Sequence, residues 1–229
     1  RFLRDSVTCD WASSRWIQIK ESNLTMRILV VMDPIANAGA DEDTSIGFML
    51  AAQRRGHQVE YCQLKDLYIR NGAGHAVSRA VRLNLSASPF YQLGEPIHSF
   101  LSEFDTIWMR KDPPVDDAYL HGTHIFDLAG PDVLVVNSPE GLRYANEKLY
   151  AQQFPQFCPE TLVTRDMDGI RKWLDTRSDP LIVKPVDGHG GRGIFRLDKN
   201  DRNIGSILET LSEDGRLWVV AQSYLPEAR

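Results

Sequence analysis

Apolar runs typical of buried strands alternate with helical patterns along most of this 229-residue chain. The run over 26–32 is rich in β-branched residues and predicts a first buried strand, and a helix over 44–55 that ends before Gly56 follows it. The remaining elements of this half are predicted as strands over 59–62, 106–109 and 133–136 and a helix over 116–129. Strands that alternate with helices indicate an α/β fold with a mainly parallel sheet.

A different pattern follows Ser138 and Pro139, which together favour the start of a helix. We expect that helix to carry Asn146, Glu147 and Lys148. The later elements are predicted as a helix from a Thr164 cap to 176, strands over 181–184, 194–197 and 218–222, and a helix over 203–211. The change of pattern divides the chain into an N-terminal α/β substrate domain over 26–145 and a second domain over 146–229. Because the chain stops at Arg229 directly after a strand, we expect this second domain to be incomplete.

Residues 1–25 fit neither pattern. They show no helical stripe and no strand alternation, and they lack the apolar segment of a secretory signal. We interpret them as an extraneous or disordered leader, with Met26 as the true start of the protein.

Composition and charge exclude several classes of function. With 42% hydrophobic and 25% charged residues the chain has the balance of a globular protein, and its net charge of −5 argues against nucleic acid as a partner. No run of eighteen apolar residues occurs, which argues against a membrane span. Cys9, Cys62 and Cys158 are widely spaced and form no disulfide or zinc pattern, which favours the cytoplasm.

The segment richest in candidate chemistry is a glycine loop over residues 188–193, with glycine at 188, 190, 191 and 193. Glycines allow positive φ and close approach, so successive backbone N–H groups can converge on an anion such as phosphate. The spacing matches G-x-G-x-x-G, but a strand rather than a helix is expected after it, which excludes a dinucleotide-binding fold. A flexible hairpin without a ligand is the alternative.

Two lysines bear on this choice. Lys184 ends an apolar strand directly before the loop, where an ammonium is costly to bury unless an anion meets it. Lys148, judged from its spacing alone, is better explained as a solvated helix lysine. Lys184 therefore favours the phosphate-binding interpretation of the loop.

Two further residues follow predicted parallel strands of the first domain. Arg110 and Asp33 lie where ligands gather in α/β sheets, so both are candidates for substrate binding. For Arg110 and its neighbour Lys111, the alternative is an ion pair with Asp112 or another neighbour. For Asp33 the alternative is a helix cap or an ordering role in its loop.

Six sequence blocks in fixed order carry a family resemblance. The chain from Met26 to its last residue resembles bacterial glutathione synthetases of the ATP-grasp superfamily, and residues 1–25 lie outside the match. The blocks are Met32–Asn37, Ala52–Gly56, Met109–Pro114, Asn146–Leu149, Pro159–Thr164 and Lys184–Gly191.

The resemblance implies an N-terminal α/β domain followed by an ATP-grasp domain, of which 146–229 is a part. Lys148 and Lys184 correspond to the lysines expected at the ATP phosphates. Gly188, Gly190 and Gly191 correspond to the loop that closes over those phosphates. The segment expected at the adenine edge corresponds to Gln222, Tyr224 and Leu225.

The reaction that the resemblance implies is the ATP-dependent joining of γ-glutamylcysteine and glycine through an acyl phosphate, carried out by a homo-oligomer with Mg²⁺. The family's metal ligands and catalytic residues are expected beyond Arg229, so none is assigned here, and the chain as given is expected to be an inactive fragment. Two alternatives remain: another ATP-grasp carboxylate–amine ligase, such as a ribosomal-protein-modifying glutamate ligase, and a non-catalytic nucleotide-binding module.

Overall fold

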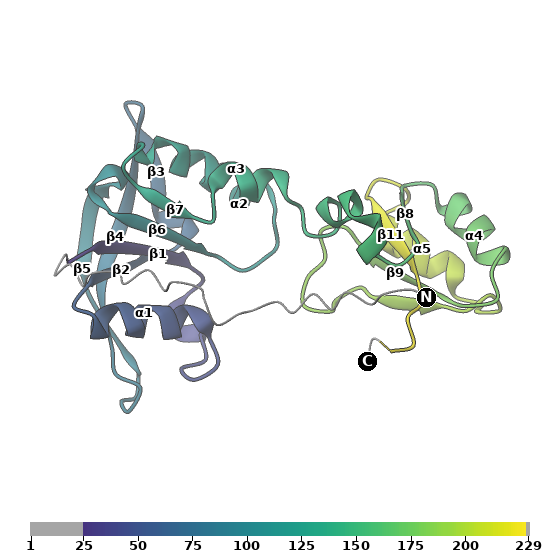
Figure 1. Cartoon of the computed structure of the whole chain (residues 1–229), viewed down its shortest axis with the longest axis horizontal. Helices are drawn as coiled ribbons and strands as arrows, with labels where there is room; N and C mark the ends of the chain where they lie inside the picture. Colours follow the sequence, from purple (N-terminus) through teal and green to yellow (C-terminus); the bar gives the residue numbers. More distant parts are fainter. Residues whose placement is uncertain (1–24, 228–229) are drawn as a thin grey trace, which may run out of the picture.

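The chain folds into two lobes, each built on its own β-sheet (Figure 1). The structure is a computed structural model that describes residues 25–227. Except for Thr25, the expected leader over residues 1–25 lies outside the described residues. Each lobe is described below from the strands that form its sheet.

The first lobe contains a seven-stranded sheet in the order β3-β4-β2-β1-β6-β7, with β5 paired to β4. Its strands are β1 (Arg27–Met32), β2 (Gln58–Cys62), β3 (Leu67–Arg70), β4 (Ala73–Leu83), β5 (Tyr91–Phe100), β6 (Thr106–Arg110) and β7 (Leu134–Val136). The pairs β1–β2, β1–β6 and β6–β7 are parallel. The predicted α/β class and each predicted parallel strand are confirmed.

The antiparallel pairing within the sheet was not predicted. It pairs β4 with β2, β3 and β5, so the sheet as a whole is mixed. The sequence pattern gave no strand over Tyr91–Phe100, because Gly94 and Pro96 both disfavour strands. Pairing with the long strand β4 overrides this preference, and the register shifts between Arg79 and Val81, as at a β-bulge.

Helices cover both faces of this sheet. The alternate residues Ile28, Val30 and Met32 of β1 pack with α1 (Thr44–Arg54), whereas Leu29 and Val31 face α2 (Asp117–Phe126). Because both faces of β1 are covered, the strand is apolar throughout instead of alternating with polar residues. This central strand therefore positions whatever follows its carboxyl end.

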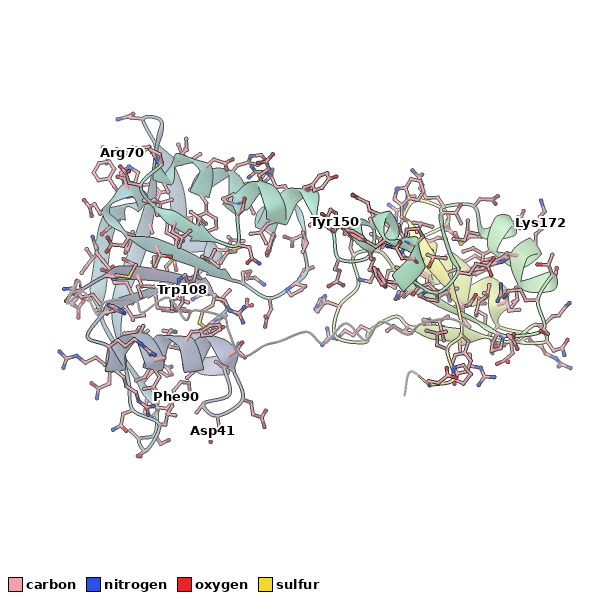
Figure 2. All side chains as sticks on the ribbon, viewed as in Figure 1. Asp41, Arg70, Phe90, Trp108, Tyr150 and Lys172 are labelled. Carbon is pink, nitrogen blue, oxygen red and sulfur yellow. The ribbon has the colours of Figure 1, made fainter. Side chains whose placement is uncertain are left out.

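Helix α1 is defined by local signals in the sequence. The Asp43 side chain accepts a hydrogen bond from the Ser45 N–H, which caps the helix. Gly56, at φ +80°, follows its last turn. Phe48 on the same helix meets the Trp108 ring of β6 edge-on, with ring centroids 5.9 Å apart. Figure 2 labels Trp108.

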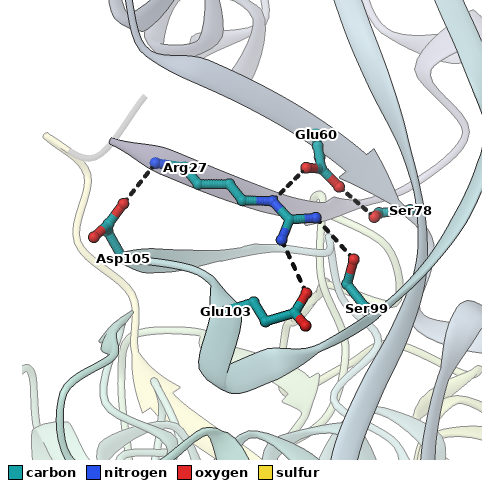
Figure 3. Close-up of polar contacts among 6 residues, drawn as sticks. All are labelled: Arg27, Glu60, Ser78, Ser99, Glu103 and Asp105. Carbon is teal, nitrogen blue, oxygen red and sulfur yellow. Dashed lines mark hydrogen bonds and ion pairs between the residues drawn. The ribbon is translucent and has the colours of Figure 1, made fainter. Parts of the chain in front are cut away.

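A polar cluster links several strands at the N-terminal end of β1 (Figure 3). The Arg27 guanidinium donates to Glu60 at 2.6 Å, to Glu103 at 3.0 Å and to the Ser99 hydroxyl at 2.7 Å. The other carboxylate oxygen of Glu60 accepts from the Ser78 hydroxyl. Burial acts to lower the pKa of Arg27, but the two carboxylates outweigh it and raise that pKa. The cluster thus ties β1, β2, β4 and β5 together.

The second lobe contains a four-stranded antiparallel sheet in the order β10-β9-β11-β8. Its strands are β8 (Thr161–Thr164), β9 (Leu181–Pro185), β10 (Phe195–Leu197) and β11 (Val219–Ser223), and its helices are α4 (Met167–Asp175) and α5 (Ile204–Ser212). The two helices pack on one face of the sheet. The core between them contains Ile170, Leu174, Leu208, Leu181, Val183 and Ala221.

Two local predictions in this half were wrong. Helix α3 (Pro139–Tyr144) ends before Asn146, so Lys148 lies in a turn and not on a helix. The reason is that the Asn146 side chain accepts the backbone N–H groups of Lys148 and Leu149, an arrangement that competes with helix formation. Thr164 ends strand β8, and the cap of α4 is Asp166.

Short 3-10 helices complete the described chain. They are η2 (Ile35–Asn37), η3 (Leu64–Asp66), η4 (Leu101–Glu103), η5 (Asp127–Ala129), η6 (Tyr150–Gln153) and η7 (Pro155–Phe157).

Candidate nucleotide-binding site

The glycine loop connects β9 to β10, and its backbone requires glycine at several positions. Gly190, Gly191 and Gly193 have φ values of +58°, +74° and +71°. Residues with a side chain rarely adopt this left-handed region, because their Cβ approaches the carbonyl oxygen. The loop therefore favours glycine at these three positions.

Gly188 serves a different purpose, which is close packing. A Cβ at this position would lie 2.5 Å from Cγ of Pro185 and 3.4 Å from the carbonyl oxygen of Arg192. The absence of a side chain lets the two arms of the loop approach each other closely.

Lys148 is held against the start of this loop. Its ammonium donates to the carbonyl oxygens of Val186 at 2.9 Å and Gly188 at 2.5 Å, and to the Glu147 carboxylate at 2.7 Å. An ammonium has three N–H donors, so these contacts satisfy it fully. The sequence prediction of a solvated lysine based on spacing is wrong, since the Lys148 side chain is only 14% exposed.

Lys184 lies on β9, on the face of the sheet opposite to the helix-covered core. Leu181 and Val183 are buried in the helix-covered core, and alternation along the strand turns Lys184 to the other face. Burial lowers the pKa of Lys184, and the nearby charge of Lys148 lowers it further, whereas Glu147 acts in the opposite sense. Among the described residues, the Lys184 ammonium has no hydrogen-bond or ion-pair partner.

The two lysines and the loop line one small cavity of about 140 Å³. This is smaller than the roughly 300–1,000 Å³ of a cleft that encloses a drug-sized ligand, so it suits a phosphate group instead of a whole nucleotide. The structure thus brings together Lys148, Lys184, Gly188, Gly190 and Gly191. The lining also includes residues that the sequence analysis did not select: Glu147, His189 and Arg192.

The predicted adenine segment lies at the end of β11. The Gln222 side chain donates to the Thr161 hydroxyl at 2.9 Å, and the Tyr224 N–H donates to the carbonyl oxygen of Pro180 at 3.2 Å. Leu225 follows the strand and is exposed. Strand β11 pairs antiparallel with β9, with Ser223 opposite Leu181 and Val219 opposite Pro185, so this segment lies at the end of β9 opposite to the glycine loop.

Arg110 and Asp33 are placed separately, at the carboxyl ends of the paired strands β6 and β1. Arg110 donates to the hydroxyls of Ser45 at 3.0 Å and Thr44 at 2.8 Å, at the start of α1. Asp33 forms an ion pair with Lys111 at 3.0 Å.

The contacts of Asp33 match the structural alternative from the sequence analysis. Its carboxylate accepts the Asp112 backbone N–H at 3.0 Å as well as the Lys111 ammonium, so it orders the loop after β6. A cavity of about 420 Å³ lies beside it, lined by Lys65, Lys111 and His121 among others.

Within residues 25–227, no group of three or more His, Cys, Asp or Glu side chains is arranged to hold a metal ion. The part of the chain that the structure describes therefore supplies no such three-residue site for a metal ion. No helix in that range is long and apolar enough to cross a membrane.

Several solved structures share the fold of this chain. D-cycloserine synthetase DcsG superposes with a TM-score of 0.57 at 16% identity, over 87% of this chain and 59% of that chain. D-alanyl-alanine synthetase A from Vibrio cholerae superposes with a TM-score of 0.57 at 11% identity, over 88% and 60% of the two chains. A RimK domain protein ATP-grasp from Sphaerobacter thermophilus gives a TM-score of 0.56 at 14% identity, over 87% and 64%. The chain therefore has an ATP-grasp fold.

Sequence comparisons identify the family of this chain. The family model described as "Prokaryotic glutathione synthetase, N-terminal domain" matches residues 26–143, and "Prokaryotic glutathione synthetase, ATP-grasp domain" matches 147–229. The chain belongs to the prokaryotic glutathione synthetase family.

Individual relatives agree with this assignment. Glutathione synthetase of Shewanella oneidensis is 41% identical over 203 residues, and that of Salmonella typhi is 41% identical over 202 residues. Each alignment covers 88% of this chain, and the chain spans 64% of the length of each of these relatives.

Proposed function

We propose that this chain binds the phosphate groups of ATP in the cavity between the glycine loop and its two lysines. The observation that carries the proposal is the convergence of Lys148 and Lys184 on one cavity whose wall is the loop of Gly188, Gly190 and Gly191. A partly buried ammonium without a protein partner, as at Lys184, is costly until an anion neutralises it. A bound polyphosphate would supply that anion.

We further propose that the protein is an ATP-dependent ligase that joins γ-glutamylcysteine and glycine to form glutathione. Family membership and the 41% identity to proteins named glutathione synthetase support this assignment. In the first step a carboxylate oxygen of the dipeptide attacks the γ-phosphorus of ATP, and the bond to ADP breaks. In the second step the glycine amine attacks the acyl phosphate carbon, inorganic phosphate leaves, and the amine proton is lost.

The described residues contribute to the first step through charge and position. As the phosphoryl group moves from ADP to the carboxylate, negative charge spreads over its oxygens, and fixed ammoniums and N–H groups stabilise that charge. A loop closed over the phosphates also excludes water, which would otherwise hydrolyse the acyl phosphate.

The adenine and substrate parts of the proposed site lie in different domains of the chain, which we place at 146–229 and 26–145. We assign the adenine edge to the backbone near Gln222, Tyr224 and Leu225. In the first domain Arg110 is proposed to bind a substrate carboxylate, since it forms no ion pair among the described residues. Asp33 is proposed to hold the neighbouring loop in place for that substrate. A homo-oligomer in the cytoplasm is the expected form of the protein.

Calorimetric titration of the chain with ATP tests the nucleotide site. Loss of a charged contact removes about 1.5–3 kcal/mol, so Lys184→Ala should weaken ATP binding by about tenfold or more. Lys172→Ala is the control, because Lys172 lies exposed on α4 of the same lobe and does not line the cavity (Figure 2). Unchanged ATP affinity of the Lys184→Ala variant would contradict the proposed nucleotide site.

A coupled assay tests the reaction. A protein of this family that spans the full length of the relatives, supplied with ATP, γ-glutamylcysteine and glycine, should release phosphate and form glutathione in equal amounts, whereas the chain as given is expected to show no turnover. Phosphate release that does not depend on glycine, or that proceeds equally with a different amino acid, would point to another ATP-grasp ligase.

A further inference from the structure

Arg192 is a cationic residue of the glycine loop. It lies between Gly191 and Gly193, which both have positive φ, and its backbone N–H donates to the carbonyl oxygen of His189 at 3.1 Å. Its side chain is exposed and lines the same cavity as Lys148 and Lys184.

Arg192 differs from most other arginines of the second lobe in having no protein partner among the described residues. Five arginines of the lobe bind a carboxylate or a carbonyl oxygen: Arg165, Arg171, Arg177, Arg196 and Arg216. Arg202 also has no partner in the part of the chain that the structure describes, but it does not line the cavity.

The cations that line the cavity are not equally available to a ligand. Lys148 already donates to Glu147, Val186 and Gly188, so its three N–H groups are occupied. Lys184 and Arg192 are the lining cations that remain without a partner within the described residues. A guanidinium can bind phosphate through two parallel N–H groups, which an ammonium cannot do.

We propose that Arg192 binds the polyphosphate of the nucleotide directly and so adds a third cation to the site. This inference rests on the proposed function, because it assigns a further residue to the same ligand. The flanking glycines have no side chains that restrict the loop, so the guanidinium can turn from solvent into the cavity when phosphate enters. Arg192 would then fasten the loop over the ligand through its own side chain.

Titration of the chain with ATP, ADP and adenosine tests this role. Arg192→Gln should weaken ATP and ADP binding by about tenfold, as expected for loss of a charge-assisted contact, and should leave adenosine binding unchanged. Arg192→Lys should recover part of the lost affinity because it restores the charge without the paired donors. Arg202→Gln is the matched control and should bind ATP as the unaltered chain does.

The outcomes separate this inference from the proposed function. If Arg192→Gln binds ATP normally while Lys184→Ala does not, the role of Arg192 is wrong and the site stands. If Arg192→Gln weakens adenosine binding as much as ATP binding, the substitution distorts the loop, and direct phosphate contact is also wrong. If the unaltered chain binds no ATP, or Lys184→Ala binds it normally, the proposed function itself is overturned.

Discussion

Gly188→Ala should disturb the proposed nucleotide site through a steric clash alone. The φ of Gly188 lies outside the left-handed region, so alanine can adopt its backbone conformation. The new methyl group, however, would lie 2.5 Å from Cγ and 3.3 Å from Cδ of Pro185. Because the proline ring cannot swing away as a flexible side chain would, the backbone of the loop must move.

The size of the effect follows from that contact. Forcing one extra methyl group into a filled position costs about 1–3 kcal/mol in the free energy of unfolding. The Gly188 carbonyl oxygen accepts from Lys148, so a shifted loop also displaces this ammonium. Misplacing one charged contact corresponds to about tenfold weaker ATP binding.

Two other glycines provide comparisons. Gly190→Ala meets no atom within 4 Å but must hold φ at +58°, which costs about 1–2 kcal/mol. Gly47→Ala, in the first turn of α1, also meets no atom within 4 Å and should stabilise the chain by about 0.5–1 kcal/mol. Of these three glycines, Gly188 is the one whose replacement acts through a steric contact.

Urea unfolding followed by circular dichroism measures the stability of the three variants, and calorimetry measures their ATP affinity. The reasoning predicts that Gly188→Ala loses both stability and affinity and that Gly47→Ala loses neither. Gly188→Ala with the stability and ATP affinity of the unaltered chain would refute the packing argument.

Three further predictions concern charged and titratable groups. The pKa of Lys184 is lowered by burial and by Lys148, so the unfolded chain holds this proton more tightly than the folded chain does. Charged Lys184 therefore lowers the free energy of unfolding. This destabilisation is complete at neutral pH and disappears as the pH rises from the lowered pKa towards the ordinary lysine value of about 10.4. Lys184→Met should therefore raise the melting temperature of the ligand-free chain at pH 7 while weakening ATP binding; a lower melting temperature would contradict this. Glu60→Gln should lower the free energy of unfolding, measured with urea, by about 2 kcal/mol. This is less than the loss for a fully buried ion pair, because Arg27 keeps two other partners. An unchanged urea midpoint would argue against a stabilising role of the cluster. Burial raises the pKa of the Cys62 thiol, so iodoacetamide at pH 8 should not modify it until the chain is unfolded; peptide mapping that finds labelled Cys62 in the folded chain would show otherwise.

Sequence patterns predicted those parts of the fold that depend on local signals. The apolar run of β1 and the end of α1 before Gly56 are short-range features, and the structure confirms them. Strand β5 depends on pairing with β4, which a sequence window around Gly94 and Pro96 cannot show. Long-range pairing of this kind was the main source of error in the first lobe.

The candidate site was predictable to a similar degree. The glycines and Lys184 stand together in the sequence, so their shared cavity could be expected. Lys148 reaches the loop from 38 and 40 residues away, and nothing in its own spacing indicated this contact. Arg192 could have been selected from the sequence, because it is the arginine placed between two glycines of the loop.

The Arg27 cluster has a consequence for how this protein can vary between organisms. Its contacts lie where β1 begins, whereas Asp33 and Arg110 lie where β1 and β6 end. Mutations around Asp33 and Arg110 therefore leave the contacts of Arg27 that link the strands intact. If this rim binds substrate as proposed, the residues that recognise it can change without loss of the ability to fold, provided that the opposite rim keeps its contacts.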